Sequence, residues 1–458
     1  MSKSKFQADA ETMKAMLDGV SPSLCLAKWK QVSLHLTTGM NNSCYHPPLH
    51  PIDTVEIAIN PAALHNTQQK KEARMQMMAG ERPSECSYCW AMEDNGKFSD
   101  RVYRSGEPWA AKDFNAIVAT PDADVTPSYV EVNFNHACNL ACSYCSPQFS
   151  STWMQEAKKH GPYPTTTPHN DIKYFVGNRG PIPNREYNPY VEAFWKWWPE
   201  LYKELIHFRM TGGEPLMDKN TYRVFDYVLE NPNPNLHLNV TSNFSVDNGL
   251  WVKYLNTVKE LCDGRIEHFM QYVSLDSMYG QAEYIRAGMN FGQVWQRVHQ
   301  YLGKIENYNS LTFIITMNNL SIHKLRQYLE AILSLRQAYS RTYQRVWFDT
   351  PVLRTPDWQS LQILPEHYAD KLDEIVDWMK LNLETPADPY HGFKDYEVER
   401  LERDIAWMRN GTTDLERKKA DFYKFFVEYD RRHKYNFLKT FPELEAFWEE
   451  CKYYADKA

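Results

Sequence analysis

The chain has 458 residues, of which 43% are hydrophobic and 24% charged, and its formal net charge is −7. This length allows two or three domains, or one large barrel with appended segments, and a core that needs no disulfides. The mild acidity argues against general nucleic-acid binding, which needs a basic face. No segment approaches the roughly 18 apolar residues of a membrane-spanning helix, so no membrane association is expected.

Cysteine usage points to a reducing compartment. Seven of the nine cysteines fall in two clusters, and an odd total makes a poor disulfide framework. The first residues, Met1–Phe6, lack the apolar core of a signal peptide. We therefore expect a cytoplasmic protein. Cys262 and Cys451 stand alone and are interpreted as buried thiols.

The first cluster belongs to residues 1–110, which we predict to be a small N-terminal metal-binding domain. Val32, Leu34 and Leu36 alternate with polar residues before a Gly/Asn turn, a pattern that predicts a β-hairpin with a cysteine on each side. A polar helix is expected over about residues 67–80. The candidate ligands are Cys25, Cys44, Cys86 and Cys89. The last two can reach one metal from a single turn, and both zinc and an iron–sulfur cluster suit four thiolates.

The second cluster follows a predicted strand. A polar connection over residues 91–127 is expected to lead into Tyr129–Phe134, which alternates apolar and polar residues as a half-buried strand does. Cys138, Cys142 and Cys145 follow at spacings of four and three. Three thiolates on one loop can ligate an iron–sulfur cluster and leave one of its four irons open. The alternatives are a three-cysteine zinc site completed by His136 and thiols that are close by chance.

Strand and helix patterns then alternate. Further strands are predicted at 206–211, 236–241, 269–275, 311–317 and 345–350, with helices at 217–230, 248–261, 323–338 and within 279–305. Such alternation predicts an α/β fold with a parallel sheet and right-handed crossovers. With the strand before the cysteine loop, this makes six β/α units within residues 125–355.

Two further segments lie outside these units. Residues 161–189, rich in Pro, Gly, Asn and aromatic residues, are interpreted either as a lid or substrate loop or as a solvated excursion. Residues 356–458 are predicted to be a helical extension that flanks or caps the barrel. Its helices are expected at 366–381, about 397–410 and about 414–455. The aromatic residues at 422–426 are interpreted as packing.

Two motifs, in this order, resemble those of the radical SAM enzymes. The cysteine triplet with Tyr144 matches the family's C-x3-C-x-aromatic-C signature, and Gly212-Gly213-Glu214-Pro215, at the end of the next strand, matches its GGEP motif. The resemblance implies a partial (β/α)6 TIM barrel and a 4Fe–4S cluster on the triplet. It also implies S-adenosylmethionine as the ligand of the open iron. In that family, reductive cleavage of this cofactor gives a 5′-deoxyadenosyl radical that abstracts hydrogen from a substrate.

The resemblance also assigns cofactor contacts to strand ends. The positions are Tyr144, Gly212, Gly213, Glu214, Pro215, Thr241, Ser242, Asn243, Ser274, Asp276, Arg286 and Asn318. Arg286 occupies the place of an arginine that pairs with the cofactor carboxylate, and a surface helix arginine is the alternative. Asp276 and Asp349 lie near strand ends and are candidate catalytic bases. For each of them, a helix-capping role is the alternative.

The N-terminal cysteine–hairpin–cysteine element resembles part of the SPASM and twitch auxiliary-cluster domains. In relatives this element lies after the barrel, whereas here it precedes it, so a variant twitch-type domain is expected. The resemblance favours a second 4Fe–4S cluster over structural zinc. It implies an oxidoreductase that performs a two-electron oxidation or a cross-link on a peptide or protein side chain, with an electron donor such as flavodoxin or ferredoxin.

Three alternatives to this reading stay open. The first keeps the chemistry and changes the substrate to a small molecule such as a sugar, aminocyclitol or nucleotide. The second is an enzyme whose N-terminal zinc domain docks a carrier or partner protein. The third is a non-catalytic zinc-binding interaction protein, which explains neither the GGEP match nor the six β/α units.

Overall fold

The computed structural model describes residues 5–457 and divides into two compact units. Unit 1 comprises Met1–His136, Val176–Gly212 and Asn233–Asn239, and unit 2 comprises Ala137–Phe175, Gly213–Pro232 and Val240–Ala458. The predicted boundaries near residues 110, 125 and 355 stay predictions. No helix among the described residues is both long enough and apolar enough to cross a membrane.

A mixed sheet of nine strands runs in the order β11-β10-β8-β7-β6-β4-β1-β2-β3. The strands are β1 Gln31–His35, β2 Met40–Asn42, β3 His50–Pro51, β4 Tyr129–Asn133, β6 His207–Thr211, β7 Asn233–Ser242, β8 Ile266–Ser274, β10 Asn309–Ile314 and β11 Val346–Asp349. The pairs β1–β4, β4–β6, β8–β10 and β10–β11 are parallel. A parallel α/β sheet is thus confirmed, and the partial barrel stays a prediction.

The predicted hairpin enlarges this sheet. Strand β1 pairs with β2 in antiparallel register, and its other edge pairs in parallel with β4, with Val32 opposite Val130. The sheet therefore exceeds the six predicted strands, because β1, β2 and β3 extend it beyond β4. Valines 130 and 132 of β4 are fully buried, as the alternating pattern predicted.

Helices follow the strands of unit 2 in the predicted alternation. They are α11 Lys219–Glu230, α12 Asn248–Leu261, α13 Tyr279–Ile285, α14 Phe291–Lys304 and α15 Leu325–Tyr339. Side chains at the N-caps fix several starts: Asp247 accepts a hydrogen bond from Leu250 N of α12, and Asn290 accepts one from Gln293 N of α14. Two short strands, β5 Ala141–Cys142 and β9 Arg286–Ala287, form a separate antiparallel pair.

Residues 91–127 were predicted to be a polar connection. The structure corrects this expectation, because the segment is largely helical and part of it is buried. It contains α5 Ser87–Asp94, α6 Asp100–Gly106, α7 Pro108–Ala111 and α8 Phe114–Ala119. Trp109 and Ile117 are buried in one cluster with Trp29, which lies in α2 Ala27–Lys30. Burial of a few large side chains therefore outweighs the polar average of this segment.

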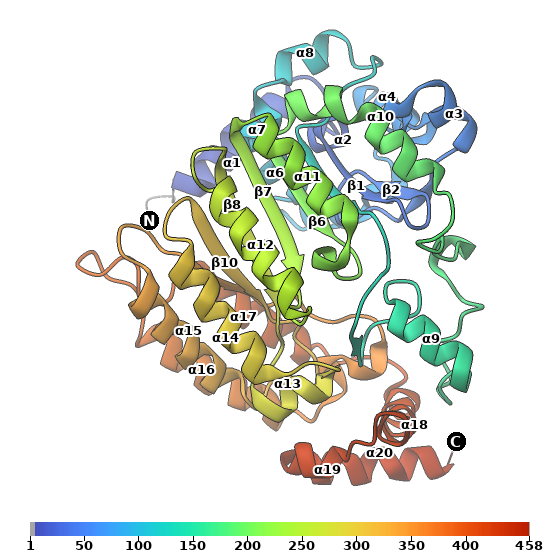
Figure 1. The fold of residues 1–458 in the computed structure, drawn as a ribbon, viewed down its shortest axis with the longest axis vertical. Coiled ribbons are helices and arrows are strands. Elements are labelled where there is room, and N and C mark those ends of the chain that lie inside the picture. Colours follow the sequence, from blue (N-terminus) through green and yellow to red (C-terminus); the bar gives the residue numbers. More distant parts are fainter. Residues whose placement is uncertain (1–4, 458) are drawn as a thin grey trace. The chain divides into compact units, whose positions relative to one another are not determined.

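The C-terminal extension is helical, as predicted, with one correction. It contains α16 His367–Lys380, α17 Asp395–Arg409, α18 Leu415–His433, α19 Phe437–Thr440 and α20 Glu445–Lys457. The single helix expected over about 414–455 breaks at Lys434, whose φ of 59° ends α18, and Asn436 caps α19. After this break α20 packs against α18 (Figure 1). Phe422, Phe425 and Phe426 are fully buried, in agreement with a packing role.

Candidate metal centres

The three-cysteine loop of unit 2 lies between β4 and α9 Ser151–His160 and is held by many backbone contacts. Trp153 Nε1 donates to Cys142 O at 2.9 Å, and Thr152 Oγ1 donates to Cys138 O at 2.7 Å. Ser143 exchanges two hydrogen bonds with the side-chain amide of Gln359. These contacts fix the path of the loop and therefore the direction of its three thiols.

Part of the 161–189 segment contributes to the same loop. His169 Nε2 donates to Tyr144 O at 3.2 Å, and Asn170 Nδ2 donates to Cys145 O at 3.0 Å. Burial, the largest influence, lowers the pKa of His169, which keeps the ring neutral and able to donate one proton. Residues 161–175 are thus attached to the cysteine loop, which argues against a solvated excursion. The sequence carries no signal for these contacts, because both side chains bind backbone carbonyls.

Arg286 contacts the second cysteine of the triplet. Strand β9 places it opposite Cys142, and its Nη1 lies 3.6 Å from Cys142 Sγ. Its Nε and Nη2 bind the two carboxylate oxygens of Asp276 at 2.8 and 3.0 Å, and Nη2 also donates to Tyr144 OH at 2.6 Å. Tyr144 OH in turn donates to Asp276 Oδ2 at 2.8 Å. The structure therefore joins four sequence-predicted residues in one buried network.

The GGEP match meets the start of the cysteine loop. Glu214 N donates to Ala137 O at 2.6 Å. The Glu214 carboxylate is buried and accepts from Ser242 Oγ and Asn243 N, both at 2.8 Å, and from Leu216 N at 3.1 Å. Burial raises its pKa to about 7, and these donors oppose that rise. Asn243 also donates to Asn139 Oδ1 at 3.1 Å, which links the end of β7 to the loop.

The first glycine of the motif is required by its surroundings. Gly212 has a φ of 124°, and a Cβ there would lie 2.5 Å from Asn133 Oδ1 and 2.9 Å from Asn135 O. No other residue fits without a shift of this backbone. Gly213 follows, and Pro215 begins a short 3₁₀ turn, Pro215–Met217, capped by Glu214.

The remaining predicted site residues lie at or after the ends of strands β7, β8, β10 and β11. Thr241 and Ser274 are half-buried ends of β7 and β8. Asn318 is fully buried and bonds locally, donating to Thr316 O and accepting from Leu320 N. Asp349, at the end of β11, forms an ion pair with Arg400 of α17. Neither candidate base is a free carboxylate, because Asp276 is bound to Arg286, and both catalytic roles stay predictions.

In unit 1 the four N-terminal cysteines line one cavity. They come from three segments, and the lining also includes Lys28, His46, Asp100, Arg101 and Arg104. The Cys25 sulfur accepts hydrogen bonds from the backbone of Ala27 and Lys28, and Cys44 accepts one from the backbone of His46. The backbone of Arg101 and the side chain of Ser99 oppose the rise that burial causes in the pKa of Cys89. Such donors favour thiolate ligands, so the donor chemistry fits a metal or an iron–sulfur cluster.

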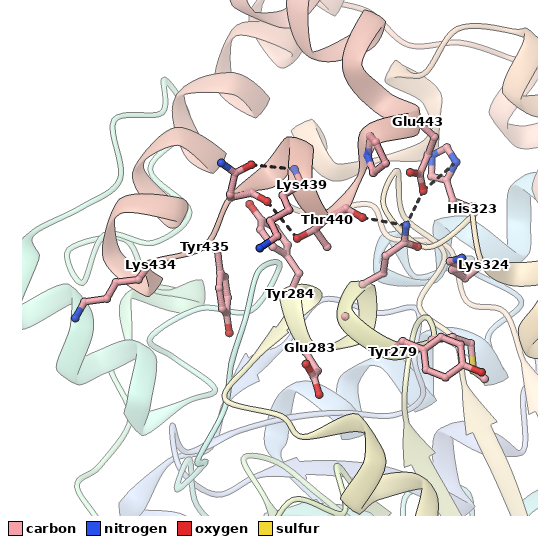
Figure 2. A pocket seen from close by; sticks show the side chains of 15 residues that line it. Tyr279, Glu283, Tyr284, His323, Lys324, Lys434, Tyr435, Lys439, Thr440 and Glu443 are labelled. Carbon is pink, nitrogen blue, oxygen red and sulfur yellow. Dashed lines mark hydrogen bonds and ion pairs between the residues drawn. The ribbon is translucent and has the colours of Figure 1, made fainter.

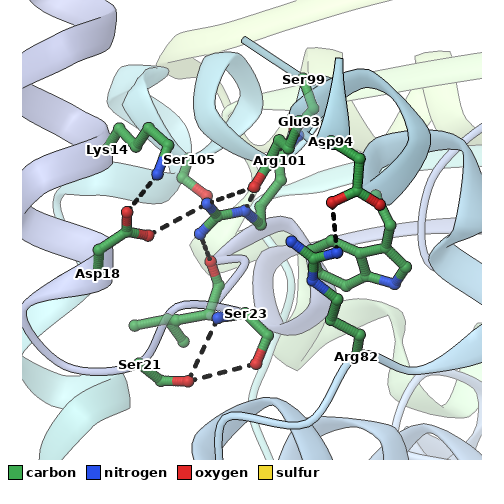
Figure 3. Close-up of polar contacts among 12 residues, drawn as sticks. Lys14, Asp18, Ser21, Ser23, Arg82, Glu93, Asp94, Ser99, Arg101 and Ser105 are labelled. Carbon is green, nitrogen blue, oxygen red and sulfur yellow. Dashed lines mark hydrogen bonds and ion pairs between the residues drawn. The ribbon is translucent and has the colours of Figure 1, made fainter. Parts of the chain in front are cut away.

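Two buried cations accompany these thiols. Lys28 forms an ion pair with Glu85, and although burial alone would lower its pKa, Cys86 and Glu85 raise it above the usual value. Arg101 binds Glu93 through Nε at 2.8 Å and Asp18 through Nη2 at 3.2 Å, and its Nη1 donates to Leu24 O (Figure 3). Both cations lie too far from their partners in sequence to be predicted from a local pattern.

Basic side chains around α4 Gln68–Met78 hold the backbone beside Cys25. Arg74 Nε donates to Lys28 O, His65 Nε2 to Trp29 O, and Lys70 Nζ to Gln31 O, at 3.2, 2.6 and 2.9 Å. All three side chains are buried. They fix the short α2–β1 segment, and with it the placement of Lys28 in the cavity wall.

Burial opposes ionisation of the thiols at both sites. Burial raises the pKa of Cys138, Cys44 and Cys89 to about 12 and that of Cys86 to about 11. Metal ligation needs thiolates, so metal binding at either site would release protons. Among the described residues, no three or more Cys, His, Asp or Glu side chains are gathered closely enough to hold a metal ion. Both ligand sets therefore stay predictions, supported by donor chemistry and by placement.

Comparisons with known proteins add little. No protein-family model matches the chain, and no curated protein matches it. Two solved structures that resemble it are crystal structures of Streptococcus suis SuiB, one of them bound to S-adenosylmethionine. Each has 11% sequence identity and a TM-score of 0.37 and covers 77% of this chain; the match spans 69% of the S-adenosylmethionine-bound chain and 68% of the other. A likeness this distant carries no argument, so the interpretation rests on the residues of this chain.

Proposed function

We propose that this protein is a radical SAM oxidoreductase that acts on a peptide or protein side chain. The observation that carries the proposal is the meeting of three separate segments in unit 2. Glu214 binds Ala137 O beside the first cysteine of the triplet, and Ser242 and Asn243 bind the Glu214 carboxylate. A buried carboxylate between strand ends suits an ammonium ligand such as the methionine amino group.

The residues of the loop have distinct roles in this proposal. Cys138, Cys142 and Cys145 hold a 4Fe–4S cluster, and Arg286 stabilises the Cys142 thiolate because its guanidinium lies 3.6 Å from that sulfur. When bound there and reduced by an external electron donor, a cluster would supply the electron for reductive cleavage of S-adenosylmethionine. Asp276 holds Arg286, and Tyr144 bridges the two.

The four-cysteine cavity of unit 1 is proposed to hold a second 4Fe–4S cluster. Four thiolates complete the coordination of such a centre, so we assign it electron transfer and not substrate ligation. Lys28 and Arg101 reduce the cost of burying its negative charge. Zinc would use the same four ligands in a structural or docking role.

The test is the metal content of anaerobically purified protein, with S-adenosylmethionine cleavage measured beside it. We expect about eight irons and eight sulfides per chain, falling to about four of each in Cys86→Ala/Cys89→Ala and to about four in Cys138→Ala/Cys142→Ala. Reduced wild-type protein should form 5′-deoxyadenosine, and the Cys138→Ala/Cys142→Ala variant should not. Four irons with one zinc, the zinc lost with Cys86 and Cys89, would reassign unit 1. Protein without iron would contradict the radical function.

A further inference from the structure

Unit 2 contains an open pocket that the proposed chemistry does not use. Its volume is about 910 Å³, and it lies between α13 and the C-terminal segment 434–443 (Figure 2). Met278 and Tyr279 of its wall follow β8, and His323 and Lys324 follow β10. The pocket is therefore built from segments after the carboxyl ends of two parallel strands, where α/β proteins bind their ligands.

Three lysines and two glutamates line this pocket, so its formal charge is +1. Lys434 and Lys439 are exposed and Lys324 is half-buried, and none has a carboxylate partner among the residues that the structure describes. The two carboxylates of the pocket are already engaged. Glu443 accepts from Gln281 Nε2 at 2.5 Å and faces His323 Nδ1 at 3.7 Å, and Glu283 accepts from Phe291 N at 2.9 Å.

The backbone at two places on the pocket wall is constrained. Tyr279, at the start of α13, has a φ of 52°, and Lys434, at the end of α18, has a φ of 59°. A left-handed conformation outside glycine persists only where the surroundings impose it, and such residues gather at ligand sites. Tyr279 is also half exposed, at 51%, and leaves an aromatic face beside the charged groups.

Tyr284, which lines the pocket, is linked to the cysteine loop. Tyr429 OH lies 3.1 Å from Tyr284 O of α13 and 3.0 Å from Ala141 O, beside Cys142, and shares its one proton between the two carbonyls. Ser143 N donates to Ile285 O at 2.7 Å. The next residue is Arg286, so a ligand that contacts α13 touches the element that positions the Cys142 network.

We propose that this pocket binds an acidic segment of the polypeptide substrate. Free ammonium groups supply charge complementarity, and the side-chain amide nitrogen of Asn436, a donor, and the hydroxyl oxygen of Thr440, an acceptor, suit a peptide backbone. This inference rests on the proposed function, because the bound segment is part of the proposed polypeptide substrate.

The test is binding of a fluorescein-labelled oligoglutamate peptide to the full-length, metal-loaded protein, followed by anisotropy at low salt. Lys324→Gln/Lys434→Gln/Lys439→Gln should weaken binding roughly tenfold and flatten its salt dependence. The matched control, Lys253→Gln/Lys259→Gln/Lys304→Gln, removes the same charge from α12 and α14 of the same unit and should change binding less than twofold.

Three outcomes would overturn the inference. The first is that the wild type does not bind the peptide, and the second is that both triple variants lose the same peptide affinity. The third is that inorganic pyrophosphate displaces the peptide at concentrations below the peptide's own Kd, which would make the pocket a small-anion site. Metal content and 5′-deoxyadenosine formation are measured on the same samples. Cleavage without peptide binding contradicts this inference alone, and peptide binding without iron contradicts the proposed function alone.

Discussion

The two cysteine sites are built in opposite ways. In unit 2, three thiols lie on one loop of eight residues, Cys138–Cys145, and a single cation, Arg286, contacts one of them. In unit 1, four thiols converge from segments between Cys25 and Cys89, and the cavity wall carries Lys28 and Arg101. The ligands of the first site are neighbours in sequence, although distant residues such as Gln359 fix the path of their loop, whereas the ligands of the second site are brought together by the fold of a whole unit.

The ion pair of Arg286 beside the triplet and the ion pair of Lys28 in the four-cysteine cavity also differ. Arg286 binds Asp276 with two donors, and both side chains are almost fully buried. Lys28 offers one ammonium to Glu85, whose side chain is 17% exposed. A two-point pair between buried groups resists rearrangement more than a single contact to a partly solvated carboxylate does. Arg101 of unit 1 binds Glu93 in the same two-point way, through Nε at 2.8 Å and Nη2 at 2.9 Å, so we expect only the Lys28 pair to tolerate changes better.

The largest effect is expected from Asp276→Ala. The variant leaves Arg286 buried without a counter-ion, which should lower the stability of unit 2 by about 3 to 5 kcal/mol. Amide hydrogen exchange should show loss of protection in β5, β9 and the end of β8, with unit 1 unchanged. The matched surface control, Glu402→Ala, removes the exposed partner of Lys380 and should cost less than about 1 kcal/mol. Equal losses in both units would show that the pair does not act locally.

A buried carboxyl group without a cation at contact distance makes stability depend on pH. Asp404 of α17 is buried and accepts from Thr350 Oγ1 at 2.8 Å. Burial raises its pKa to about 6, against the hydrogen bond from Thr350 and nearby arginines. Its ionised form therefore destabilises the fold above pH 6, and the free energy of unfolding should rise as the pH falls from 7 to 4.

Asp404→Asn removes this ionisation and keeps an acceptor for Thr350. It should raise the free energy of unfolding by about 2 to 3 kcal/mol at pH 8 and have little effect at pH 4, because one pKa unit corresponds to about 1.4 kcal/mol. Urea unfolding at both pH values measures the difference. If the stability gain of Asp404→Asn over wild type is no larger at pH 8 than at pH 4, the raised pKa does not belong to Asp404.

Local features were predicted well and long-range ones were not. The helix predicted at 248–261 is α12 Asn248–Leu261, because its cap, Asp247, is a neighbour in sequence. Lys28 pairs with a carboxylate 57 residues away, and Asn170 binds a carbonyl 25 residues away. The break at Lys434 was missed because no glycine or proline marks it. In both candidate sites the candidate ligands could be predicted from the sequence. The groups that position these cysteines or carry the charges beside them are brought there by tertiary structure and could not be predicted.

Replacing Lys28 tests whether unit 1 needs its cation. Lys28→Met keeps the aliphatic volume and leaves Glu85 without its partner, which should cost about 2 kcal/mol. The variant should lose metal from the four-cysteine site to a chelator faster than wild type, with the iron of the triplet retained. Lys14→Met, which breaks the more exposed ion pair with Asp18, is the control and should behave as wild type (Figure 3). Simultaneous loss from both sites would indicate general unfolding.

The smallest effect is expected from Asn170→Ala, which tests whether the 161–175 segment holds the triplet loop. Asn170→Ala removes the donor to Cys145 O and should cost about 1 kcal/mol, the net contribution of one buried hydrogen bond. Because that bond positions the peptide that carries the third thiol, iron should bleach faster in air from this site, with unit 1 unaffected.

Lys173→Ala changes an exposed side chain of the same segment and should leave the bleaching rate unchanged. If both variants bleach at the wild-type rate, the segment only covers the loop. If Asn170→Ala alone accelerates bleaching, the loop site is not purely local, because residues 25 positions away then set its geometry.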